Sequence, residues 1–475
     1  MNRNIYENIS PIDSRYYKSY PDLSEELSRY LSERSSIYYQ ALVEVALINV
    51  LERYGVAPPG SSEEIKNALR NLDPDEVYRE EEKTRHNIRA LVNVMQRYVN
   101  EKVAPYIHLT ATSEDITSCA NALRIRDAFY KVVIPKTIRL IEVMIEIVER
   151  EADTVQIGRT HGQHAVPITV GYVFSGYVNR LGERLQKMLM AVDDLRGKMS
   201  GAVGAYNASS LIVEDPKKFE EDVLAELRLK PSAFSSQIVE PEYILDLIHA
   251  VVSAFGVLAQ ISDDMRHLQR TEIGEMGESF EKDQVGSSTM PHKRNPWNFE
   301  HVKSMWKEFM PRVITRYMDQ ISEHQRDLTN SASGRFIVEI ITGYVMCVER
   351  LTKQLSKLVV DKKRILENLK ATGGMYLAEP LYVLLAYHGF KDAHERVRRL
   401  TLRAEKESRS LIELVREDES FKPVLEDKKW KSLEEDFTSY TGKAKERALA
   451  ISYIWRAKLD EIRGLCQNYK EVNYV

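Results

Sequence analysis

The sequence predicts an all-α protein in which a long central helical bundle is flanked by smaller N- and C-terminal helical domains. Several runs of apolar residues recur at alternating steps of three and four, which is the pattern of a helix with one buried seam. Strand-like alternation is scarce over the same stretches. Each run forms a helix of roughly 35 Å or more at about 1.5 Å rise per residue, and helices of that length pack side by side as a bundle.

The predicted elements divide the chain into three parts. Pro135 is expected to kink or interrupt the first long helix. Before residue 107 the helices are shorter and are separated by polar breaks such as GVAPPGSSEE, and after residue 361 they become short and highly charged. The long helices are expected at residues 123–148, 170–195, 244–268 and 337–358. We therefore predict an N-terminal domain over 1–107, a central bundle over 108–361 and a C-terminal domain over 362–475.

Composition excludes several classes of function. The chain has 475 residues, 43% of them hydrophobic and 29% charged, and a net charge of −4, so neither a nucleic acid nor a membrane surface is indicated as a partner. The first residues lack the apolar core of a signal peptide, and no uninterrupted apolar run is long enough to span a bilayer. The three cysteines lie far apart, which argues against a disulfide framework. We expect a soluble cytoplasmic protein.

Metal and cofactor motifs are also missing. No glycine-rich turn follows a strand, so a Rossmann or P-loop site has no support. His161 and His164 are close in sequence, but no acidic or sulfur ligand stands at a helical offset from them. We therefore expect activity without a metal or an organic cofactor.

Polar motifs cluster at the ends of the long helices rather than on their seams. They are KTRHN, HLTATSED, GRTHGQHAVP, GSSTMPHKRNP at 286–296 and EHQRDLTNSASGR. Together they supply arginines, a lysine, hydroxyl donors and histidines that titrate near neutrality. This set of groups suits a polyanionic substrate whose reaction needs proton transfers.

Each motif also has an ordinary structural interpretation. A single histidine beside a glycine is more often a cap or a hydrogen-bonded structural residue than a catalyst. TSED is a plausible helix N-terminus, with Thr112 or Ser113 as the cap and acids in the first turn. Taken one at a time, these motifs do not decide the function.

Taken together, the motifs resemble one family. GSSTMPHKRNP is similar to the signature loop of the fumarase/aspartase superfamily, whose members eliminate fumarate from a substituted succinate. KTRHN, TSED, GRTHGQHAVPITVG, SGAVGAYNA, RHLQRTEIGE and QRDLTNS, with the opening SPIDSRY, resemble the adenylosuccinate lyase branch. The resemblance runs from about Ser10 to about residue 400, with the motifs in the expected order. It implies cleavage of adenylosuccinate to AMP and fumarate, and of the succinyl-carboxamide ribotide to AICAR.

The resemblance also implies a role for each motif residue. Ser287 would be the base and His161 the acid, with Glu300 orienting the imidazole. Lys293 and Asn295 would hold the carboxylate on which charge accumulates. His86 would touch the substrate, and Thr112 and Ser113 would bind a succinyl carboxylate at a helix N-terminus. The remaining substrate-binding residues would be Arg15 and Tyr16 at the phosphate, with Arg85, Asn87, Gln237, Arg326, Ser331 and Arg335. The family resemblance further implies a homotetramer whose active sites are shared between subunits.

Three positions depart from the pattern. Asn87 replaces an aspartate that is usual after Arg-His, Thr110 stands where glycine is common, and Glu242 stands where aspartate is usual. Asn87 is the best argument for an alternative: another lyase of the superfamily, such as argininosuccinate lyase, or a relative with an altered succinyl substrate. A helical scaffold without catalysis is the third hypothesis, and the presence of Ser287, His161 and Lys293 argues against it.

Overall fold

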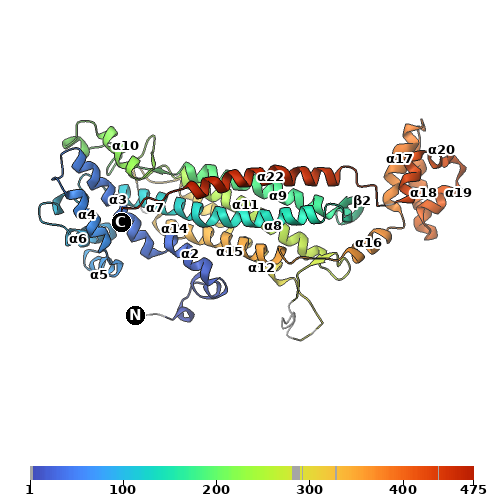
Figure 1. The fold of residues 1–475 in the computed structure, drawn as a ribbon, viewed down its shortest axis with the longest axis horizontal. Helices are drawn as coiled ribbons and strands as arrows, with labels where there is room; N and C mark the ends of the chain where they lie inside the picture. The colour runs from blue at the N-terminus through green and yellow to red at the C-terminus, as the bar shows by residue number, and fades with distance from the viewer. Residues whose placement is uncertain (1–3, 281–288, 291, 327–328, 437, 475) are drawn as a thin grey trace.

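The computed structural model of the chain describes residues 4–280, 289–290, 292–326, 329–436 and 438–474. Its centre is an elongated bundle of long helices, with shorter helices gathered at both ends (Figure 1). The prediction of an all-α protein is confirmed. The strands of the described part are short, and each pairs with a single other strand.

The N-terminal helices cover one end of the bundle. They are α1 (Tyr17–Ser19), α2 (Pro21–Leu31), α3 (Glu33–Arg53), α4 (Ser61–Arg70), α5 (Pro74–Thr84) and α6 (Asn87–Gln96), with α10 (Pro216–Glu226) packed against α3. Most of α3 is buried between the bundle and the other helices of this end. These helices therefore share one continuous apolar core with the bundle.

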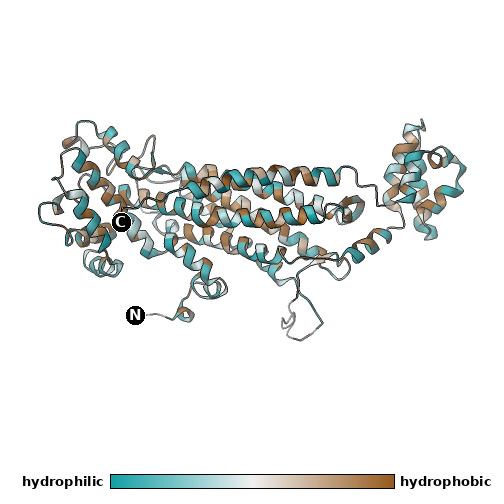
Figure 2. Ribbon diagram, in the orientation of Figure 1, coloured by the Kyte–Doolittle hydropathy of each residue, from teal (hydrophilic) through white to brown (hydrophobic). Residues whose placement is uncertain are grey.

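The long helices lie where the apolar seams predict them. They are α7 (Ser113–Ala128), α8 (Ile134–Arg150), α9 (Val170–Asp193), α11 (Glu242–Leu268) and α15 (Ile337–Leu355), with α12 (Trp297–Phe309), α13 (Arg312–Met318) and α14 (Ser331–Arg335) alongside. Pro135 sits in the first turn of α8, where proline is tolerated, and a π-helical turn over Phe129–Val133 joins α7 to α8. The predicted interruption at Pro135 is therefore present. Brown apolar residues alternate with teal polar ones along these helices (Figure 2), and the buried residues of α9, α11 and α15 are mostly apolar.

Two helical stretches, Glu242–Leu268 and Ser331–Leu355, are long and apolar enough to cross a membrane by length and composition. Neither stretch is an uninterrupted apolar run in the sequence, because charged residues interrupt both. In the structure α11 packs against α9, α12 and α15, and most of its apolar side chains are buried. Burial of these side chains in the bundle accounts for the high hydropathy of α11.

A β-hairpin extends the far end of the bundle between α8 and α9. Strand β1 (Val155–Thr160) pairs with β2 (Gln163–Thr169), and the other strands are two-residue pairs: β3 (Arg196–Gly197) with β4 (Lys230–Pro231), and β5 (Met276–Gly277) with β6 (Val359–Val360). The hairpin lies between the bundle and a small helical domain, and Ile157 joins that domain's core.

The small domain holds α16 (Lys362–Lys370), α17 (Ala378–Tyr387), α18 (Ala393–Glu407), α19 (Leu411–Glu417), α20 (Lys422–Leu425) and α21 (Lys428–Glu435). Its core is separate from that of the bundle, and the fully buried Trp430 belongs to it. The first helix of this unit, α16, begins at Lys362.

The last helix departs from the predicted domain boundary. Helix α22 (Ala444–Asn468) leaves the small domain and runs back along α8 and α9 (Figure 1). Trp455 is fully buried and donates a hydrogen bond from Nε1 to Asn179 Oδ1 at 3.1 Å. A Cβ atom at Gly182 would lie 2.5 Å from the Trp455 ring, so the absence of a side chain there permits this close packing. The segment 362–475 is therefore a small domain followed by a bundle helix.

Candidate active site

One group of predicted substrate residues meets at the N-terminus of α7. Thr112 is the N-cap residue, as predicted for TSED, and its backbone N–H donates to the Asp115 carboxylate at 2.8 Å. His86 is the N-cap of α6 and accepts a hydrogen bond from the Arg89 backbone N–H at its Nδ1. The other ring nitrogen of His86 lies 3.5 Å from Ser113 Oγ. Two helix N-termini therefore present an imidazole and hydroxyl groups to the same space, which is a favourable place for an anion.

Arg326 joins this group from a distant part of the chain. Its guanidinium Nη2 lies 3.5 Å from the Glu114 Oε1 atom in the first turn of α7, and its side chain is only 12% exposed. Its Nε is buried and has no hydrogen-bond partner within the described ranges. Ser331 and Arg335 begin and end the short helix α14 that follows. Arg326, of the QRD motif, therefore lies beside the first turn of α7.

Arg85 and Asn87 flank His86 on the exposed side of this group. Arg85 ends α5 in the left-handed conformation, with φ of 54°, and Asn87 is the first residue of α6. Both side chains are exposed. Gln237 lies half-buried in the loop between β4 and α11.

A second group surrounds the start of α12. Arg15 and Tyr16 belong to a π-helical turn over Ile12–Tyr16, and the Tyr16 ring centroid is 5.6 Å from that of His301. Glu300 precedes His301 and is exposed in the first turn of α12. Lys293 is exposed and Asn295 half-buried in the segment that leads into this helix. Ser287, the predicted base, lies outside the described residues.

His301 is held as a neutral imidazole. Burial lowers its pKa to about 4, and the positive charges of Arg350 and Arg15 act in the same direction. Its Nε2 is buried without a hydrogen-bond partner in the part of the chain that the structure describes. A neutral ring therefore lies beside Tyr16, one of the predicted phosphate-binding residues.

The third group is the tip of the β-hairpin. His161 and Gly162 form its two-residue turn, both with positive φ (55° and 74°), which is the backbone of a type I′ turn. His161 is exposed at this tip. Behind it, Arg159 binds the carboxylate of Glu275 through both terminal nitrogens, at 2.5 Å and 3.0 Å. The hairpin therefore carries the predicted acid on a turn that a buried ion pair anchors.

The three groups are separated within one chain. The hairpin lies at the end of the bundle next to the small domain, whereas the start of α7 lies toward the N-terminal helices (Figure 1). Among the contacts of the described residues, no hydrogen bond joins His161 to Glu300, its predicted orienting partner. Within the described residues, the hairpin tip and the start of α7 therefore lie apart in a single copy of the chain.

Sequence reasoning missed several buried residues that hold these groups in place. Glu275 is fully buried and accepts hydrogen bonds from Gln156 and Asn368 as well as from Arg159. Asp115 and Lys198 form an ion pair that is also fully buried. Both Asp115 and Glu275 lie inside quoted motifs, TSED and RHLQRTEIGE, so an acid within a motif was the available signal. Lys198 had no comparable signal.

The chain matches known family models and relatives over most of its length. A lyase family model matches residues 15–310, and a model described as adenylosuccinate lyase C-terminal matches residues 322–436. The chain is 34% identical to the adenylosuccinate lyase of Pyrococcus abyssi over 447 residues, covering 92% of this chain and 96% of that one. It is 32% identical to the adenylosuccinate lyase of Archaeoglobus fulgidus, covering 92% and 97%.

Solved structures share the fold. A fumarate lyase from Mesorhizobium sp. BNC1 superposes with a TM-score of 0.79 at 23% identity, covering 90% of this chain and 97% of that one. A 3-carboxy-cis,cis-muconate lactonizing enzyme from Pseudomonas putida gives 0.80 at 22% identity, covering 94% and 99%. The family models and the relatives of more than 30% identity over nearly the whole chain lead to one conclusion: this chain belongs to the adenylosuccinate lyase family of the fumarase/aspartase superfamily.

Proposed function

We propose that this protein cleaves adenylosuccinate to AMP and fumarate, and the succinyl-carboxamide ribotide to AICAR and fumarate, in purine biosynthesis. The observation that carries the proposal is the 34% identity to an adenylosuccinate lyase over 92% of the chain. The meeting of His86, Ser113 and Arg326 at the N-terminus of α7 supports it, because a dicarboxylate substrate needs such an anion site. The small molecule bound would be a purine nucleotide, and we place the reaction in the cytoplasm.

The reaction is a β-elimination in which the groups have separate tasks. Ser287 removes a proton from the carbon next to a carboxylate, the carbon–nitrogen bond breaks, and His161 protonates the departing nitrogen. The electron pair of the broken C–H bond becomes the second bond of fumarate. Lys293 and Asn295 stabilise the carboxylate that carries the extra charge of the intermediate, and Thr112 and Ser113 hold a succinyl carboxylate. Arg15 and Tyr16 take the phosphate, next to the neutral His301.

We further propose that the working enzyme is a homotetramer whose sites combine residues of different subunits. The separation of the hairpin, the α12 group and the α7 group within one chain supports this arrangement. Exposed apolar side chains on helices of the bundle, such as Ile314 and Met318 of α13 and Tyr453 of α22, support it too, since a second copy would cover them.

The test is an ultraviolet assay of the purified protein with adenylosuccinate, with argininosuccinate as the control substrate. We expect turnover of adenylosuccinate alone. Turnover of argininosuccinate alone would assign the chain to the alternative that Asn87 suggests. We also expect activity to survive exhaustive chelation, and a loss that a divalent ion restores would contradict the proposal of cofactor-free catalysis.

A further inference from the structure

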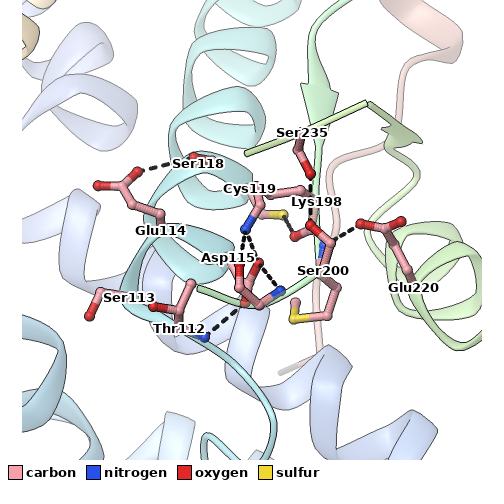
Figure 3. Close-up of polar contacts among 12 residues, drawn as sticks. Thr112, Ser113, Glu114, Asp115, Ser118, Cys119, Lys198, Ser200, Glu220 and Ser235 are labelled. Atoms are coloured by element: carbon pink, nitrogen blue, oxygen red, sulfur yellow. Dashed lines mark hydrogen bonds and ion pairs between the residues drawn. The ribbon is translucent and has the colours of Figure 1, made fainter. Parts of the chain in front are cut away.

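A buried ion pair lies behind the anion site of α7. Lys198 Nζ contacts Asp115 Oδ1, and both side chains have no exposed surface (Figure 3). Removing two charges from water is costly, and their mutual attraction compensates only when further hydrogen bonds complete their shells. A fully buried ion pair therefore adds little to stability by itself. Because this one lies next to the Thr112–Ser113 turn, we looked for a role in holding that turn.

The pair joins the first turn of α7 to the SGAVGAYN loop. Asp115 accepts hydrogen bonds from the Thr112 backbone N–H at 2.8 Å and from the Gly201 N–H at 3.3 Å. Lys198 donates a second bond to the Gly201 carbonyl at 3.1 Å. Gly201 has φ of 82°, a conformation that other residues rarely adopt. The position of Thr112, and with it that of Ser113, is therefore set through this pair.

The same loop reaches the segment that carries Gln237. Ser200 and Ser235 share a hydrogen bond of 2.7 Å between their hydroxyl groups, two residues before Gln237 (Figure 3). On the other side of Ser200, the Met199 N–H donates to buried Glu220 at 2.6 Å. Ser200 thus follows a residue whose backbone is held by Glu220, and its own hydroxyl links the loop of the ion pair to a second predicted substrate-binding segment.

We propose that Lys198 and Asp115 are positioning residues that hold the carboxylate-binding turn at Thr112–Ser113 and, through Ser200, the segment of Gln237 in register with each other. Neither side chain reaches the surface, so neither touches substrate. The inference rests on the proposed function, because it takes the α7 N-terminus and Gln237 as parts of one substrate site.

The expected effect is on substrate affinity more than on turnover. Without Lys198, the buried Asp115 carboxylate loses its counter-charge, and it must take up a proton or turn toward water. Either change weakens its bond to the Thr112 N–H and displaces the anion site. Because the proposed base and acid come from other parts of the chain, KM for adenylosuccinate should rise by roughly tenfold or more while kcat falls less.

The experiment compares four variants: Lys198→Met, Asp115→Asn, the double variant of both, and Ser200→Ala. The inhibition constant for fumarate reports on the carboxylate-binding turn at Thr112–Ser113. The inhibition constant for AMP reports on the segment of Gln237. Leu459→Ala, which removes a buried side chain of α22, a helix that packs against α8 and α9, is the control for a general loss of stability. Thermal unfolding is recorded for each protein.

Support requires three results. Lys198→Met and Asp115→Asn weaken fumarate inhibition and raise KM, the double variant recovers part of both, and Ser200→Ala weakens AMP inhibition with little change for fumarate. Leu459→Ala should lower the unfolding temperature and leave KM unchanged. If Lys198→Met does not fold, Ser200→Ala still tests the link to Gln237.

The inference is overturned if the single variants lose stability as Leu459→Ala does but keep KM and both inhibition constants, since the pair is then purely structural. It is also overturned if Ser200→Ala leaves AMP inhibition unchanged. A wild-type protein that fails to cleave adenylosuccinate would instead refute the proposed function. Wild-type activity is therefore measured before any variant is compared.

Discussion

The carboxylate of Glu275 accepts hydrogen bonds from both terminal guanidinium nitrogens of Arg159, at 2.5 Å and 3.0 Å. Glu275 itself has no exposed surface. Arg159 stands two residues before His161 on strand β1, so this ion pair fixes the base of the turn on which the predicted acid sits. The same carboxylate accepts a hydrogen bond from Asn368 of α16, which ties the hairpin to the small domain.

The first prediction concerns this anchor. Glu275→Gln should lower kcat by roughly tenfold or more, because a displaced acid loses its alignment with the leaving nitrogen. KM should change less, since the carboxylate- and phosphate-binding groups lie elsewhere. Steady-state kinetics measure both. Arg456→Met, which breaks an exposed two-bond ion pair between Arg456 of α22 and Glu149 of α8, is the matched control and should leave kcat unaltered. An unchanged kcat in Glu275→Gln would show that the Arg159–Glu275 ion pair does not position His161.

A second prediction separates the acid from the turn that carries it. His161→Asn should abolish most turnover, by roughly 10²–10⁴-fold, because asparagine cannot deliver the proton. Asparagine favours the left-handed backbone that this position adopts, so the hairpin should stay intact. Ser287→Ala and Lys293→Ala should be similarly severe. Circular dichroism and size-exclusion chromatography check the fold. Retention of most activity by Ser287→Ala would show that another group is the base.

Asn87 gives a third prediction. Asn87→Asp should be tolerated and should alter KM more than kcat, because the amide oxygen already provides an acceptor at this position. The new charge falls on the first residue of α6, where a carboxylate is favoured by the helix dipole, so stability should be kept or slightly raised. Asn93→Asp is the contrasting variant on the same helix. It places a carboxylate against Glu80, which Asn93 contacts at 3.0 Å, and should destabilise the protein. A collapse of activity in Asn87→Asp would favour an altered substrate.

A fourth prediction follows from His301. Its folded pKa is about 4, whereas a histidine in an unfolded chain titrates near 6.5. Below about pH 6.5 the unfolded chain binds a proton that the folded chain refuses, so stability is complete above that pH and is lost as the pH falls toward 4. Chemical denaturation between these limits should show a shallower pH dependence for His301→Asn than for wild type. His292→Asn, at an exposed position in the loop before α12, should keep the wild-type slope. Equal slopes in all three proteins would contradict the assignment.

The helices that could be predicted from the sequence are those with a long apolar repeat of three and four residues. The seams of α9, α11 and α15 repeat for many turns, so their period is unambiguous, and Pro135 marks the junction before α8. Helix α22 was missed because charged residues crowd its sequence, although Trp455, Leu459 and Ile462 form a buried seam. Its partners lie some 300 residues earlier in the chain, as the bonds from Arg456 to Glu149 show. Packing between such distant segments leaves little local signal.

The candidate site was predictable as a set of residues but not as an arrangement. The hairpin was not predicted because polar and charged residues fill much of both strands and its turn, His161–Gly162, resembles part of a polar loop. Lys198 was missed because lysines are almost always exposed, and nothing in GKMSG distinguishes a buried one. The roles of Ser287 and Lys293 came from family resemblance alone, and they stay predictions.

Mixing two inactive variants tests most directly the claim that acid and base meet from different chains. His161→Asn and Ser287→Ala proteins are unfolded together, refolded, and assayed with adenylosuccinate, with each parent refolded alone as the control. If each site takes its acid from one subunit and its base from another, random assortment restores up to about a quarter of wild-type activity. Hybrid tetramers, shown by mass spectrometry, that stay as inactive as both parents would contradict the account, because acid and base would then belong to the same chain.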